Sequence, residues 1–143
     1  MKKFMLLFPL LVFSCSEDSS VDSSSTLLEE VWLKYKQTIS IGAEPIYLTF
    51  NEVLSESRCP SNVVCVWQGE ANLEFKLFTP SMYERKFNLK IEGFVGRADT
   101  VAHKYIDTLG YRITLMQLDP YPHTDSTRQI ADYSALMKIK KLE

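Results

Sequence analysis

The feature that most constrains the fold is a strict alternation of apolar and polar residues, repeated in short runs along most of the chain. It is clearest where Leu73, Phe75 and Leu77 alternate with polar neighbours. A period of two places alternate side chains on one face of a β-strand. Breaks that contain glycine or proline separate the runs at intervals of about ten residues, as in all-β domains. We therefore expect an all-β chain of seven to eight short strands, either a single antiparallel, immunoglobulin-like β-sandwich or an open barrel.

The same alternation locates the strands and two of their connections. Residues 71–77 and 86–91 are expected to pair antiparallel across a turn at Thr79-Pro80-Ser81. Gly42 and Pro45 interrupt the pattern and predict a hairpin that is longer than a two-residue turn. The first strand could open with a helical turn at residues 27–30. Met116 lies on the opposite parity from the main apolar set of its strand, so that strand is expected to be covered on both faces. The expected strands are residues 27–41, 46–51, 63–67, 71–77, 86–91, 100–106, 111–118 and 133–139.

Cys59 and Cys65 are separated by five residues that begin with a proline. In an exported protein the simplest interpretation is a disulfide bond. A zinc site completed by His103 or His123 is an alternative, although structural zinc sites favour two to four residues between cysteines. Free thiols are a further alternative. The β-branched run that ends at Trp67 predicts a short buried strand, with the indole packed on the disulfide.

The N-terminus has the order of a bacterial secretion signal. Residues 1–14 comprise two lysines, an apolar run of ten residues and a small residue, directly before Cys15. The run is too short to span a bilayer permanently. Residues 12–15 resemble the lipobox of bacterial lipoproteins, in which the cysteine is lipidated. Lipidation of Cys15 would also leave an even number of cysteines for a disulfide. An ordinary signal peptide with an incidental cysteine is the alternative.

The rest of the chain divides into a tether at residues 15–26 and one domain at residues 27–143. The tether is rich in serine and lacks apolar periodicity, so it is expected to be flexible. Its first residues, Ser16-Glu17-Asp18, resemble the acidic tag of Bacteroidota lipoproteins that reach the cell surface, although a plain solvated linker fits equally well. Removal of residues 1–14 lowers the basic count from 16 to 14 against 18 acids, which leaves a net charge of −4. This charge gives no attraction to nucleic acid.

A resemblance to a known group of proteins rests on the central segment. Arg58-Cys59-Pro60, then Cys65, Trp67 and Gly69-Glu70-Ala71 form a motif similar to one in small secreted bacterial proteins and lipoproteins that have no assigned function. The resemblance extends over residues 45–142 and includes the Pro120-Tyr121-Pro122 loop. It implies the all-β fold and the Cys59–Cys65 disulfide, and it leaves the function open.

Catalytic signatures are absent from the sequence. It has neither a Gly-x-Ser-x-Gly nucleophile elbow nor a His-Glu-x-x-His zinc motif. His123, with Asp119 and Asp125 on the same predicted loop, could bind a cation or act as an acid–base pair. A solvated turn explains these residues better, and no cofactor is expected.

Binding is the remaining class of function. Trp32 and Tyr47 lie on the opposite parity from the apolar sets of their strands, and Tyr121 lies in a predicted loop. Exposed aromatic side chains can stack on sugars or anchor a protein partner. We expect a non-catalytic protein of the bacterial envelope, held in the outer membrane by its lipid on the periplasmic face or at the cell surface, which acts by binding a protein or glycan. The alternatives are a carbohydrate-binding module, and a small envelope enzyme or metal-binding protein that uses His123.

Overall fold

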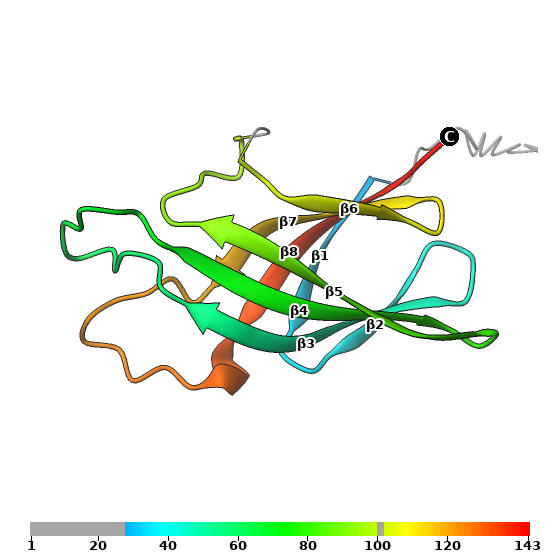
Figure 1. Ribbon diagram of the computed structural model, residues 1–143, viewed down its shortest axis with the longest axis horizontal. Coiled ribbons are helices and arrows are strands. Elements are labelled where there is room, and N and C mark those ends of the chain that lie inside the picture. The colour runs from blue at the N-terminus through cyan, green and yellow to red at the C-terminus, as the bar shows by residue number, and fades with distance from the viewer. Residues whose placement is uncertain (1–27, 100–101) are drawn as a thin grey trace, which may run out of the picture.

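The computed structural model describes residues 28–99 and 102–143, so the predicted signal peptide, Cys15 and the tether lie outside the described residues. The described chain is an all-β sandwich of two four-stranded antiparallel sheets, which do not close into a barrel (Figure 1). One sheet has the order β1-β8-β7-β6 and the other β2-β3-β4-β5. The elements are β1 (Leu28–Lys34), β2 (Thr38–Ile41), β3 (Ile46–Glu56), β4 (Glu70–Thr79), β5 (Met82–Glu92), β6 (Tyr105–Thr108), β7 (Tyr111–Asp119), the 3-10 helix η1 (Ile130–Asp132) and β8 (Ser134–Lys141).

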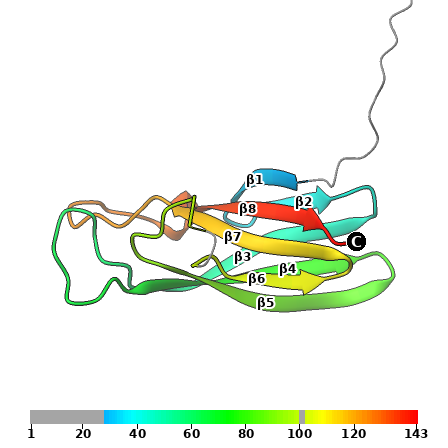
Figure 2. The ribbon, with the colours of Figure 1, turned by 90° about the horizontal axis from the view of Figure 1, so that it is seen from above.

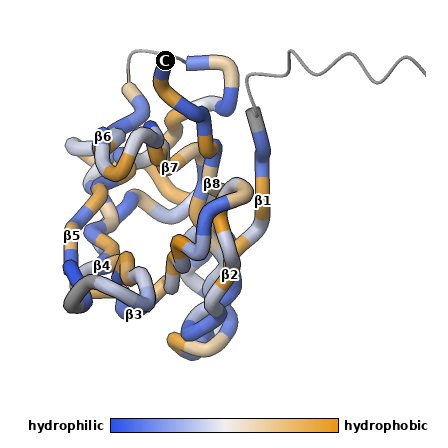
Figure 3. Tube along the Cα trace, turned by 90° about the vertical axis from the view of Figure 1, so that its right-hand side faces the viewer, coloured by the Kyte–Doolittle hydropathy of each residue, from blue (hydrophilic) through white to orange (hydrophobic). Residues whose placement is uncertain are grey.

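Hydrophilic and hydrophobic residues alternate along the strands (Figure 3), and in β4 this alternation corresponds to the burial pattern. In β4 every second residue from Ala71 to Leu77 is buried, and each faces the other sheet. Phe75 stacks on Phe50 of β3 at 5.4 Å and on Phe87 of β5 at 5.7 Å between ring centroids. These cross-strand pairs fill the centre of the core. The predicted hairpins β2–β3 and β4–β5 are both present.

The prediction of one strand over residues 27–41 was wrong, because β1 and β2 belong to different sheets. The chain turns at Lys36, which has a positive φ of 62°, and the Gln37 N–H donates to Lys34 O. Leu33 and Ile41, on either side of this turn, are both buried and are an even number of residues apart. The apolar alternation therefore continues across the break and conceals it. The predicted helical turn at residues 27–30 was also wrong over the described residues 28–30, because these residues belong to β1 and Leu28 already pairs with Lys140 of β8.

A β-bulge explains the change of parity in β7. The register against β8 shifts between Leu115 and Gln117, so one extra residue enters the strand. Leu115 and Leu118 lie in the core between the sheets. Met116 is buried outside that core, on the outer face that it shares with Arg112 and Thr114. Both faces of β7 are thus covered at this point, as the parity predicts.

The connections gather at two opposite ends of the sandwich (Figures 1 and 2). Long loops occupy one end, and tight turns occupy the other. The described chain begins and finishes at the end with the tight turns, because Leu28 pairs with Lys140. We call the first end the loop end, which comprises residues 57–69, 93–99 and 120–129, and the second the turn end, which comprises residues 42–45, 80–81 and 109–110.

Candidate binding surface

The longest protrusion of the loop end is the segment between β3 and β4, residues 57–69. Cys59 and Cys65 form a disulfide within it, with their Cα atoms 5.9 Å apart. This confirms the predicted pairing and excludes both cysteines as zinc ligands or free thiols in this structure. Cys59 is buried at the base of the segment, whereas Cys65 is exposed.

The prediction of a buried strand that ends at Trp67 was wrong. Residues 60–67 have no strand partner, and the Trp67 side chain is 80% exposed instead of packing in the core. At the base of the segment, two backbone hydrogen bonds continue the pairing of β3 with β4. The Ser57 N–H donates to Glu70 O at 2.9 Å, and the Cys59 N–H donates to Gln68 O at 2.8 Å. Beyond these bonds the chain bulges away from both sheets, so its β-branched residues have no apolar surface to cover.

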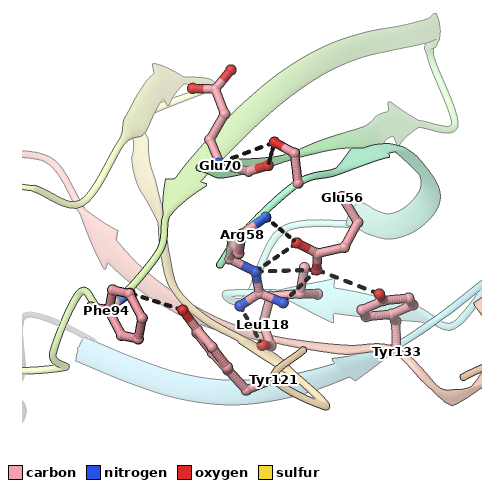
Figure 4. Close-up of polar contacts among 8 residues, drawn as sticks. Glu56, Arg58, Glu70, Phe94, Leu118, Tyr121 and Tyr133 are labelled. Carbon is pink, nitrogen blue, oxygen red and sulfur yellow. Dashed lines mark hydrogen bonds and ion pairs between the residues drawn. The ribbon is translucent and has the colours of Figure 1, made fainter. Parts of the chain in front are cut away.

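Arg58 holds the base of this protruding segment in the sandwich (Figure 4). Its guanidinium is buried and donates to both carboxylate oxygens of Glu56, with the shortest distance, 2.5 Å, between Nη2 and Oε2. Its Nη1 donates to Leu118 O at 2.9 Å, in β7 of the opposite sheet. The ring of Tyr121 lies 4.7 Å below the guanidinium carbon. One side chain therefore joins both sheets and a neighbouring loop through charge-assisted hydrogen bonds and a cation–π contact.

Tyr133 completes this buried polar cluster. Its hydroxyl donates to Glu56 Oε2 at 3.4 Å. Burial, and then the negative charge of Glu56, raise the pKa of the Tyr133 hydroxyl above its ordinary value. The phenol therefore stays protonated and remains a hydrogen-bond donor to the carboxylate at physiological pH.

Gly69 lies at the neck of the segment, where residues 57–59 run beside residues 68–70. It has a positive φ of 66°, and a Cβ at this position would lie only 1.9 Å from Ser57 O. Both facts require glycine here. Gly69 therefore brings the two backbone segments at the base of the protrusion into close contact.

Two further loops brace the protruding segment. The Ser61 N–H donates to Pro122 O at 2.9 Å, and Asn62 exchanges two hydrogen bonds with Thr124. These contacts join it to residues 120–129. On the other side, the Gly93 N–H donates to Gly69 O at 2.9 Å.

Phe94 connects the second and third loops. Its backbone N–H donates to the Tyr121 hydroxyl at 3.1 Å, and the two rings lie 5.9 Å apart. The Phe94 ring itself is 61% exposed. Three loops that are far apart in the sequence thus make one continuous surface at the loop end.

The surface is apolar at its tip. Val64, Val66 and Trp67 have exposed fractions of 103%, 89% and 80%, and Val63 is also exposed. Residues 59–69 contain no charged side chain. Clusters of exposed apolar residues on loops that a rigid scaffold holds in place are typical of interaction sites.

The three aromatic residues that the sequence suggested for binding do not form one surface. Trp32 is partly exposed on β1, and Tyr47 stacks on Phe78 on the outer face of the other sheet. Tyr121 lies under Arg58 at the loop end and is half-buried. They come from different sheets or ends, so they do not provide the row of coplanar aromatic side chains that a carbohydrate-binding platform requires.

The histidines occupy two different environments. His123 is exposed and lies 3.7 Å from Asp125, whereas Asp119 accepts a hydrogen bond from Gln117 and does not join them. His103 is buried, and both of its ring nitrogens face backbone carbonyls, Leu115 O and Gly96 O, each at 3.1 Å. Within residues 28–99 and 102–143, no three His, Cys, Asp or Glu side chains gather closely enough to hold a metal ion.

Sequence reasoning missed Phe94 and the role of Arg58. Phe94 follows Gly93 shortly after the predicted strand 86–91, and nothing in this local sequence indicates that its side chain is exposed. One sequence feature marks this surface: residues 59–69 contain no charged side chain, which is unusual for an exposed loop. The β-branched residues of the same segment predicted a buried strand instead.

Comparisons with known proteins identify no relative, since no family model matches the chain and neither a curated protein nor a solved structure is significantly similar to it. Among the described residues, no helix has the length and apolar character needed to cross a membrane.

Proposed function

We propose that this chain is a non-catalytic, lipid-anchored protein of the bacterial envelope that binds a partner through its loop end. The observation that carries the binding proposal is the exposure of Trp67 on a braced, uncharged loop. Exposed tryptophan on an ordered surface has no role in the core, and tryptophan is enriched among the residues that dominate binding energy. Because the loop is already held by a disulfide and by Arg58, little conformational entropy is lost on binding.

The anchoring part of the proposal rests on the N-terminal sequence. Lys2 and Lys3, the apolar run and Cys15 have the order of a lipoprotein signal. Several acyl chains on Cys15 would hold the protein durably at a membrane. The domain begins at the turn end, since Leu28 pairs with Lys140 there. A tether that enters at this end directs the loop end away from the membrane and toward a partner.

Intact mass of the protein isolated from its native membrane tests the anchor. The proposal expects diacyl or triacyl mass on Cys15. An unlipidated mass would refute the anchoring part.

Photocrosslinking in the native cell tests the binding surface. A photoreactive benzoylphenylalanine replaces Trp67 in one strain and Tyr105 in a control strain. Tyr105 is a suitable control because it is also an exposed aromatic residue, but it lies on β6, paired with Thr114 in the middle of β7, and not on the protruding segment. The proposal expects a discrete crosslinked band at position 67 and none at position 105. Equal or absent crosslinking at the two positions would refute it.

A further inference from the structure

Arg128 is the arginine of the loop end whose buried donors lack a partner. Arg58 pairs with Glu56, and Arg97 pairs with Glu30 at 3.0 Å. The Arg128 Nε and Nη1 atoms are buried, yet they find no hydrogen-bond acceptor within the described part of the chain. The residue as a whole is partly exposed, so its guanidinium lies just beneath the surface.

Two unpartnered donors on a buried guanidinium are an unusual feature. A buried N–H without an acceptor loses its hydration and gains nothing in return, and the loss is larger for a charged group. Nearly all buried side-chain donors in folded proteins are hydrogen-bonded, so each exception calls for a reason. Because these two nitrogens hold no hydrogen bond among the described residues, turning the side chain toward an acceptor at the surface breaks none of theirs.

The buried cluster beside Arg128 has no spare negative charge. Burial and the Glu56 charge raise the pKa of Tyr133, whereas the positive charges of Arg128 and Arg58 lower it, so Arg128 lies close to this tyrosine. Glu56 is the carboxylate of the cluster, and Arg58 binds both of its oxygens. Two positive charges against one negative charge leave the cluster with a net charge of +1.

The acidic side chains that are nearest to Arg128 in the sequence have other partners. Asp125 accepts a hydrogen bond from the Thr124 hydroxyl at 3.2 Å, and Asp132 accepts one from the Gln129 N–H at 2.9 Å. Within residues 28–99 and 102–143, neither carboxylate accepts a hydrogen bond from the Arg128 Nε or Nη1. The loop end therefore carries a guanidinium that the described domain does not neutralise.

Arg128 belongs to the same surface as the exposed Trp67. The Thr124 N–H donates to Asn62 at 3.1 Å and so fastens residues 120–129 to the protruding segment. Arg128 follows Thr124 after four residues, a chain length of at most about 14 Å. A partner that covers the apolar tip with an interface of standard size, about 800 Å² on each side, can also contact Arg128.

We propose that the partner of the loop end is an acidic protein segment, which presents a carboxylate to Arg128 beside the apolar surface that receives Trp67. This inference rests on the proposed binding role of the loop end and names the chemistry of its partner. A carboxylate carries one negative charge and neutralises the cluster, whereas a phosphate group with a charge of about −2 would reverse its sign. Guanidinium and carboxylate groups also form strong, charge-assisted hydrogen bonds.

NMR of the arginine side chains tests the site itself, on the purified, oxidised full chain with Cys15→Ser so that no lipid is attached. The probe is the α-amide of N-acetylglutamate, whose one charge is its side-chain carboxylate, and the matching glutamine compound is the neutral control. The Arg128 Nε–H signal is expected to shift and saturate with the glutamate compound only. Arg97 already has Glu30 as its partner, so its signal should stay in place. No shift at Arg128, or an equal shift at Arg97, would overturn the proposal.

Photocrosslinking from position 67 in the native cell tests whether the partner supplies the carboxylate. In that strain Arg128→Gln is expected to lower the yield of the crosslinked band about tenfold, because it removes a charged contact. Arg97→Gln, at an exposed arginine of the same end, should leave the yield unchanged. An unchanged yield in Arg128→Gln would overturn the proposal and retain the loop end as a binding surface; combined with a saturable NMR shift, it would assign the site to a free carboxylate. Absence of any band at position 67 in the parent strain would refute the proposed function itself.

Urea unfolding separates a loss of binding from a loss of folding. Arg128→Gln removes two donors that have no acceptor among the described residues, so its unfolding midpoint is expected to equal that of the parent protein or to exceed it. A clearly lower midpoint would reveal a partner of Arg128 within the domain and would overturn the proposal.

Discussion

Replacing Arg58 by alanine is expected to destabilise the domain strongly and to loosen the loop end. The Arg58 side chain is 2% exposed, and its removal leaves the Glu56 carboxylate without its cation and Leu118 O without its donor. It also removes the cation from the face of Tyr121. Leu118 is buried, and Glu56 and Tyr121 are only partly exposed, so water replaces the lost contacts incompletely.

The size of the effect follows from burial. Removing one partner of a buried ion pair typically costs about 3–5 kcal/mol, because the other charge stays buried and unpaired. The Glu56 side chain is 14% exposed, so some hydration is recovered and the lower part of that range applies. We expect the free energy of unfolding to fall by about 3 kcal/mol. With a urea dependence of about 1.5 kcal/mol per molar, the unfolding midpoint shifts down by about 2 M.

Arg112→Ala is the matched control. Arg112 makes the same kinds of contact, two hydrogen bonds to Asp107 and a cation–π contact with Tyr105 at 4.1 Å, but it is exposed. Exposed ion pairs contribute little to stability, so its midpoint is expected to stay close to that of the parent protein. Urea unfolding followed by far-ultraviolet circular dichroism measures both variants.

A second variant separates charge from packing. Arg58→Met with Glu56→Gln removes both charges and keeps most of the side-chain volume, so about half of the stability lost in Arg58→Ala should return. Equal midpoint shifts for Arg58→Ala and Arg112→Ala, or no recovery in the double variant, would refute the argument from burial.

Three other predictions concern positions elsewhere in the domain. Trp67→Ala is expected to change the free energy of unfolding by less than about 1 kcal/mol, whereas Phe75→Ala in the core lowers it by about 3–5 kcal/mol; equal losses in urea unfolding would contradict the placement of both residues. Gly69→Ala forces a Cβ against Ser57 O and should cost more than about 2 kcal/mol, and a melting temperature equal to that of the parent would disprove the need for glycine. The Arg112 guanidinium holds the pKa of Asp107 below its ordinary value of 3.8. The stability that this pair contributes is therefore present above the unfolded-state pKa and is lost as the pH falls through the folded-state pKa. In Arg112→Ala, carboxyl titration by NMR should show a higher pKa for Asp107.

Features encoded by neighbouring residues could be predicted from the sequence. Alternation within β4 and β5 located both strands and their antiparallel pairing, because each strand carries its own inward face. The hairpin between β2 and β3 follows in the same way from Gly42 and Pro45. The close spacing of Cys59 and Cys65 favoured their disulfide over a zinc site or free thiols.

Features that depend on distant residues could not be predicted. The separation of β1 from β2 is concealed because Leu33 and Ile41 keep the same parity across the turn. The extra residue in β7 is visible only in its pairing with β8. Arg58 is buried because Leu118, sixty positions along the chain, supplies an acceptor for it. Nothing near Arg58 in the sequence distinguishes it from an exposed arginine.

By itself the sequence determined an all-β domain, the positions of most of its strands along the chain, and the disulfide, since these depend on side-chain alternation and local spacing. Only the tertiary structure decided which apolar residues are buried. The run that ends at Trp67 has the composition of a core strand, yet it lies outside the sandwich because no strand lies opposite it. Burial requires a partner surface, and folding of the whole chain determines where that surface lies.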